Sequence, residues 1–178
     1  MELGLEDLAV SNGDFNSVLD DAYKKWQSAE PLVAGRILFE SIPPSNIAKW
    51  SLSILELASK WIRPPTAVER LIRSNGRQSL FGATYRQHFE AIRRVTLRLE
   101  GVLVQNQSQA CLVNLCYLAE NVAKSISNST RGDEELEFDE DSGWWIVSCL
   151  YDCAKCVGSR QFMDECEERL FRENRTSS

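Results

Sequence analysis

Apolar residues recur at spacings of three and four positions along most of this 178-residue chain. Strict alternation of apolar and polar residues, which is typical of a half-buried strand, is hard to find. The pattern therefore predicts an all-α protein with about eight helices. We expect these helices to cover residues 16–29, 31–42, 47–61, 66–76, 79–100, 108–127, 144–157 and 161–172.

Capping and turn residues separate the expected helices. Pro31 suits the first turn of a helix, because the N–H that proline lacks would have no helical partner there. Thr66 and Glu69 have the spacing of a capping box, and Gly101 and Gly158 are natural helix ends. Short connections favour packing between neighbouring helices, so we expect a compact multi-helix bundle. A short α-solenoid of helical hairpins is the lesser alternative.

The length of the chain favours a single helical domain over residues 1–178, because a chain of this size can bury most of its apolar surface without disulfides or metals. We expect residues 1–15 and 174–178 to be flexible ends and residues 128–142 to form an acidic loop. No basic region precedes an apolar run, and no apolar stretch reaches about eighteen residues. We therefore expect no signal peptide, no membrane span and a cytoplasmic location.

Three of the six cysteines, Cys149, Cys153 and Cys156, have the spacing C-x3-C-x2-C. This spacing resembles the iron–sulfur motif of radical S-adenosylmethionine enzymes. In those enzymes the motif lies early in a long α/β barrel, whereas here few residues follow it and no strand is predicted before it. On a helix the three cysteines share one face with Trp145 and Ile146, so we expect thiols that are buried in the core.

Other signs of catalytic chemistry are weak. A zinc site would need a fourth ligand from another helix, with Cys111, Cys116 or Cys166 as candidates, and such sites are uncommon without C-x2-C knuckles. We expect the thiols to stay reduced in a cytosolic protein. His88 is the only histidine, and no glycine-rich phosphate loop occurs. We therefore expect no cofactor and no enzyme activity, and a metal or iron–sulfur enzyme is the least favoured alternative.

Basic residues are concentrated in the middle of a chain whose net charge is −6. Between Lys60 and Arg98 there are nine basic residues and two acidic ones. Planar guanidinium groups on successive helices could bind phosphate. The candidate anion-binding residues are Arg70, Arg73, Arg77, Arg86, Arg93 and Arg94. We call these six arginines the arginine stripe. The chain is acidic overall and Gly76 interrupts the stripe, and both facts disfavour binding of a polyanion. Nucleic-acid or phosphate binding is therefore our second functional hypothesis.

Acidic residues are concentrated in the segment GDEELEFDED, which Trp144 and Trp145 follow closely. The segment does not match the calcium-binding loop of an EF-hand. It could be a solvated loop whose last carboxylates favour the next helix N-terminus, it could pair with arginines of the same chain, or it could attract a basic partner.

The third interpretation gives our main hypothesis, a non-catalytic protein-interaction module. Its sharper version is an immunity or inhibitor protein that binds a basic partner, and adaptor duty is equally compatible. The expected partner-binding residues are Asp133, Glu134, Glu135, Glu137, Asp139, Glu140 and Asp141.

Overall fold

All regular structure in the computed structural model is helical within the residues it describes, which are 12–74, 85–102, 106–131 and 136–175. This part of the chain contains eight α-helices, a 3-10 turn at Pro44–Asn46 and a final π-helical turn at Glu168–Arg172. The helices are α1 (Asn12–Gln27), α2 (Pro31–Glu40), α3 (Ile47–Trp61), α4 (Thr66–Arg73), α5 (Tyr85–Glu100), α6 (Gln107–Ser129), α7 (Ser142–Val157) and α8 (Arg160–Glu167). The predicted all-α class is confirmed.

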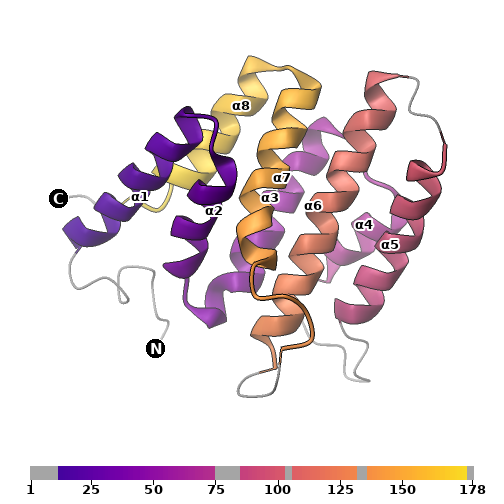
Figure 1. The fold of residues 1–178 in the computed structure, drawn as a ribbon, viewed down its shortest axis with the longest axis horizontal. Coiled ribbons are helices and arrows are strands. Elements are labelled where there is room, and N and C mark those ends of the chain that lie inside the picture. Colours follow the sequence, from indigo (N-terminus) through magenta and orange to yellow (C-terminus); the bar gives the residue numbers. More distant parts are fainter. Residues whose placement is uncertain (1–11, 75–84, 103–105, 132–135, 176–178) are drawn as a thin grey trace.

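The helices form two layers (Figure 1). The order across the front row is α1, α2, α7, α6 and α5, and α3 and α4 lie behind this row. The last helix, α8, packs on α7 and α3, and the π-helical turn after it returns to α1. Because α2 and α7 are neighbours in space but distant in sequence, the protein is a bundle. A solenoid would stack only units that are adjacent in sequence.

The core lies between the two layers and is built mainly by α3, α6 and α7. Its fully buried side chains include Ile54 and Leu55 of α3, Leu115 and Leu118 of α6, and Leu150 of α7. No helix in the described ranges is both long and apolar enough to cross a lipid bilayer.

Two glycines bring α2 and α7 unusually close together. A Cβ atom on Gly35 would lie 2.1 Å from the backbone oxygen of Trp144, and a Cβ atom on Gly143 would lie 2.2 Å from the ring of Phe39. The guanidinium carbon of Arg36 also lies 4.9 Å from the centroid of the Trp144 ring, in a cation–π contact. Helix α2 therefore braces the first turn of α7.

Some helix ends differ from the sequence prediction. Helix α1 runs from Asn12 to Gln27, so it begins four residues earlier and ends two residues earlier than the predicted range 16–29. The predicted capping box at Thr66 is wrong, because the extended backbone of Pro65 (ψ 163°) makes that proline the N-cap and Thr66 is already in the helix. The predicted helix end at Gly158 is confirmed by its left-handed φ of 73°. Residues 79–84 of the expected fifth helix lie outside the described residues.

Candidate functional site

Helices α6 and α7 form an antiparallel hairpin, and the acidic segment lies in the connection between them. Side-chain capping fixes the beginning of α6, where Asn106 Oδ1 accepts a hydrogen bond from the backbone N–H of Gln109 at 2.8 Å. The connection between the two helices runs from the end of α6 at Ser129 to Ser142, the first residue of α7. Of the predicted partner-binding residues, Asp133, Glu134 and Glu135 lie outside the described residues.

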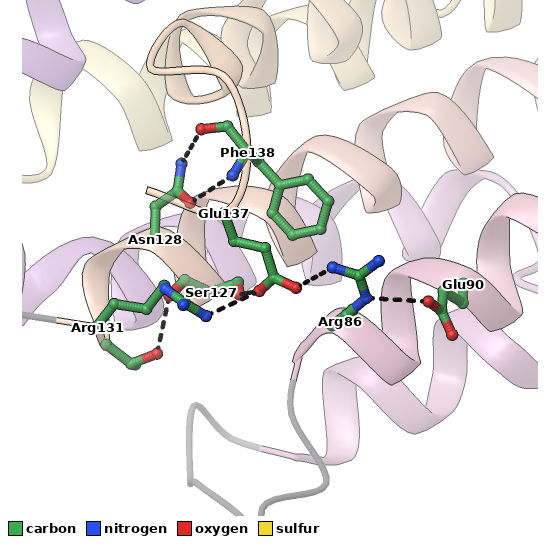
Figure 2. Close-up of polar contacts among 8 residues, drawn as sticks. Arg86, Glu90, Ser127, Asn128, Arg131, Glu137 and Phe138 are labelled. Carbon is green, nitrogen blue, oxygen red and sulfur yellow. Dashed lines mark hydrogen bonds and ion pairs between the residues drawn. The ribbon is translucent and has the colours of Figure 1, made fainter. Parts of the chain in front are cut away.

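Glu137 is the centre of a polar network at this connection (Figure 2). Its carboxylate accepts hydrogen bonds from Arg86 of α5, from Ser127 Oγ at 2.8 Å and from Arg131 Nη1 at 3.3 Å. The Glu137 side chain is only 12% exposed. Arg86 also donates to Glu90 Oε1 at 3.1 Å. The acidic and arginine-rich segments therefore pair with each other here, as one of the sequence-based alternatives proposed.

The network keeps Glu137 ionised. The hydrogen bond from Arg86 is the main cause that lowers the pKa of Glu137. Partial burial acts in the opposite direction and raises the pKa, but the Ser127 hydrogen bond and the charges of Arg86 and Arg131 lower it further. The pKa of Arg86 is raised in return, chiefly by its hydrogen bond to Glu137. Both groups therefore carry their charge at neutral pH, and the ion pair ties the connection to α5.

The next residue, Phe138, is also held in place (Figure 2). Its backbone N–H donates to Asn128 Oδ1 at 3.0 Å, and its carbonyl oxygen accepts from Asn128 Nδ2 at 3.1 Å. The Phe138 ring packs edge-on against Phe89 with 5.0 Å between the ring centroids. Glu137 and Phe138 are thus the anchored part of the connection.

The residues on either side of this anchor face solvent. Leu136 is 40% exposed and Trp145 is 41% exposed, and both are large apolar side chains. Asp139 and Glu140 are exposed, and Asp141 is half-buried at the start of α7, where its Oδ2 accepts a long hydrogen bond of 3.4 Å from Trp145 Nε1. We call Leu136, Asp139, Glu140, Asp141 and Trp145 the tip surface.

The predicted arginine stripe is divided between internal ion pairs and solvent. Arg93 Nη1 lies 3.3 Å from Glu120 Oε1, and Thr96 Oγ1 donates to the other oxygen of the same buried carboxylate at 2.7 Å. Arg86 is engaged by Glu137 as described above. Three further members are exposed, namely Arg70, Arg73 and Arg94. The last member, Arg77, lies outside the described residues. Arg86 and Arg93 are therefore bound by largely buried carboxylates of this chain, and Arg73 Nη2 lies 4.0 Å from Glu69 Oε2 in a more exposed pair.

The structure confirms that the cysteine segment is mostly core. Cys153 is fully buried, Cys149 is 8% exposed and Cys156 is half-buried. Desolvation is the main cause that raises the pKa of Cys149, to about 12, and it also raises the pKa of Cys153 well above its ordinary value. Within the described residues, no three His, Cys, Asp or Glu side chains are arranged to hold a metal ion.

The prediction that Trp145 shares the buried face is wrong. At about 100° per residue, the buried side of α7 is centred on Ile146 and Leu150, so Cys149 lies at its edge and Trp145 lies beyond it. Sequence reasoning centred this face on Cys149 and so missed an exposed aromatic side chain. The adjacent pair Trp144 and Trp145 was the available signal, because neighbouring residues on a helix cannot point in the same direction.

His88 packs as an aromatic side chain at the edge of α5. Its ring centroid lies 5.7 Å from that of Tyr85. Burial is the main cause that lowers the pKa of His88, and the charge of Arg70 lowers it further. The ring is therefore neutral at pH 7 and contributes packing.

Comparisons of the chain with protein-family models, with curated protein sequences and with solved structures find no match. The tip surface combines exposed carboxylates with exposed Leu136 and Trp145, on a connection that Glu137 and Phe138 hold in position.

Proposed function

We propose that this protein is a non-catalytic interaction module that binds a basic partner protein through the tip surface. The observation that carries the proposal is the 41% exposure of Trp145, a few positions after the exposed carboxylates of Asp139 and Glu140 in the sequence. Tryptophan is enriched among the residues that contribute most to the stability of protein complexes, whereas large apolar side chains are usually withdrawn from water. Leu136 adds a second exposed apolar side chain at the same end of the hairpin.

The anchored residues favour binding because they order the tip surface in advance. Glu137 is fixed to α5 and α6, and Phe138 is fixed by Asn128 and Phe89. A surface that is already ordered loses less conformational entropy when a partner docks. The exposed residues beside this anchor would therefore contribute more of their contact energy to affinity.

The charge of the tip surface selects the class of partner. Within the described residues, no ion pair engages the carboxylates of Asp139 or Glu140. Opposite charge steers association and disfavours acidic competitors. A nuclease with a basic active site is one such partner, since carboxylates can occupy the positions of phosphates, and this is the sharper immunity or inhibitor version of the proposal. Phosphate binding by the exposed arginines is the weaker alternative, because Arg86 and Arg93 are engaged internally.

The experiment compares three variants as immobilised bait in an extract of the cells that make the protein. Trp145→Ala removes the aromatic side chain, and Asp139→Asn with Glu140→Gln removes two charges from the tip surface. Asp21→Asn with Glu56→Gln is the matched control, because it removes two exposed carboxylates from α1 and α3. We expect a basic protein that the wild type and the control retain and that the two tip variants lose.

Calorimetry with the identified partner then separates the two contributions. Trp145→Ala should weaken binding by about 30-fold, corresponding to about 2 kcal/mol for a central aromatic contact.

The charge variant, Asp139→Asn with Glu140→Gln, should weaken binding most at low salt, and the difference in affinity from wild type should shrink as salt rises. Its melting temperature should stay within about 1 °C of wild type, because surface substitutions rarely change stability much. Equal retention of every captured protein by the tip variants and the control would contradict the proposal.

A further inference from the structure

The end of the hairpin opposite the tip surface brings two thiols together. Cys111 lies near the start of α6 and Cys156 near the end of α7, and their Sγ atoms are 2.7 Å apart. A disulfide bond is about 2.05 Å long, so only a small movement separates this contact from a covalent bond. The side-chain amide of Gln107 donates to the carbonyl oxygen of Cys156 and lies 3.4 Å from its Sγ atom. The packed helices thus hold both sulfurs in reacting positions.

We propose that Cys111 and Cys156 form a reversible disulfide by exchange with a small-molecule disulfide of the oxidised glutathione type. Neither residue belongs to the tip surface, and the proposed interaction function is not needed for this inference. The bond would link the first turns of α6 to the last turn of α7 across 45 positions of sequence.

Accessibility decides which thiol reacts first. Cys156 is half-buried, whereas the other five cysteines, all within the described residues, are buried. Exchange begins when an accessible thiolate attacks a disulfide, so Cys156 is the entry point. Burial is the main cause that raises the pKa of Cys111 to about 12, and the hydrogen bond to Cys156 raises it further. Cys111 therefore reacts second, with a mixed disulfide already beside it.

The exchange consists of two balanced steps. Cys156 loses its proton to solvent and its sulfur attacks one sulfur of oxidised glutathione, which breaks that S–S bond and releases one glutathione thiolate. Cys111 then loses its proton and attacks Cys156 Sγ, which releases the second glutathione. Both glutathione thiolates take up a proton. The protein has lost two electrons and two protons, and one glutathione disulfide has become two thiols.

The core cysteines on α7 provide a matched control. Cys149 lies two turns before Cys156 on the same helix, but it is 8% exposed and its Sγ atom accepts a hydrogen bond from Asn121 Nδ2 at 3.6 Å. Cys153 is fully buried. We therefore expect Cys149→Ser to leave the link unchanged and Cys156→Ser to abolish it.

The test incubates the reduced full-length protein with oxidised glutathione under native conditions, then traps free thiols with an alkylating reagent after denaturation. Trypsin cuts after Lys155, so the peptide 156–160 carries Cys156 without Cys149 and Cys153, while Cys111 lies in the peptide 99–124. We expect these two peptides to be linked and two of the six thiols to be lost. The peptide 99–124 also contains Cys116, so a Cys111→Ser variant is needed to show which of the two cysteines is linked to Cys156. In this variant we expect the reaction to stop at a glutathione adduct on Cys156.

Melting temperatures give a second measurement. Closing a 45-residue loop should raise the Tm of the oxidised wild type by about 5 °C or more, with no such rise in Cys111→Ser. Each of the following results would overturn the proposal: no thiol lost, a lasting glutathione adduct on wild-type Cys156, a link to Cys149 or Cys153, or a link between two chains. The peptide map of the wild type decides the question even where a variant does not fold.

Discussion

The two ends of the α6–α7 hairpin are held together by different chemistry. At one end, the sulfurs of Cys111 and Cys156 are in contact beside Gln107. At the other end, Glu137 binds Arg86 and Phe138 packs on Phe89, so the connection is fixed to α5. The first contact involves groups that can become covalently linked, whereas the second depends on charge and on aromatic packing.

This difference suggests that the two ends respond to different conditions. The thiol end should respond to oxidants and reductants, because exchange requires only an accessible thiolate and a disulfide. The tip should respond to pH and salt, because carboxylates and guanidinium groups hold it. Helix α2 braces the tip through Gly35 and Gly143, so that end also depends on close backbone packing.

The largest effect should come from breaking the brace at the tip. In Gly35→Ala the new Cβ atom would lie 2.1 Å from a backbone oxygen of Trp144, so α2 or α7 must shift. We expect a loss of about 3 kcal/mol in the free energy of unfolding, although alanine favours helix more than glycine does. Urea denaturation measures this loss. Unchanged or increased stability would show that α2 and α7 do not approach as closely as described.

A smaller effect should follow from removing the aromatic anchor. Phe138→Ala loses the contact with Phe89 and part of a half-buried ring, so we expect a destabilisation of about 2 kcal/mol. Leu136→Ala is the control, because its side chain is 40% exposed and its removal should cost less than about 0.5 kcal/mol. Equal losses in the two variants, measured by thermal or urea unfolding, would argue against a division of the connection into anchored and exposed residues.

The smallest of these effects should come from Glu137→Gln, which weakens the ion pair but keeps the shape of the side chain. We expect a loss of about 1 kcal/mol at pH 7. Because folding lowers the pKa of Glu137, its stabilisation is complete above the ordinary value of 4.5 and is lost as pH falls below it. The stability gap between wild type and variant should therefore narrow as the pH falls below 4.5. A gap that stays constant during acid titration would mean that the charge of Glu137 does not stabilise the fold.

The helices could be predicted from the sequence because their apolar spacing is local information. The periodic segments gave the helical class, the number of helices and the end of α7 at Gly158. The capping residue of α4 was misplaced by one position, because Thr66 and Pro65 compete for the same role and local spacing does not decide between them. The exposure of Trp145 was missed because the position of a helix face depends on which neighbours cover it.

The contacts that define both hairpin ends could not be derived from local pattern. Arg86 and Glu137 are 51 positions apart, and Cys111 and Cys156 are 45 positions apart. Pairing between the acidic and arginine-rich segments was foreseen as one alternative, but only the packing of α5 against α6 selects Arg86 for this role. The approach of Cys111 to Cys156 depends in the same way on the register of α6 and α7.

The exposure of Trp145 gives the protein a built-in optical reporter. The other four tryptophans, Trp26, Trp50, Trp61 and Trp144, are buried or half-buried. An indole in contact with water emits at longer wavelengths and is reached more easily by iodide than a shielded one. Docking of a partner at the hairpin tip would therefore shift the fluorescence of Trp145 to shorter wavelengths and protect it from quenching by iodide. No attached dye would be needed to follow binding.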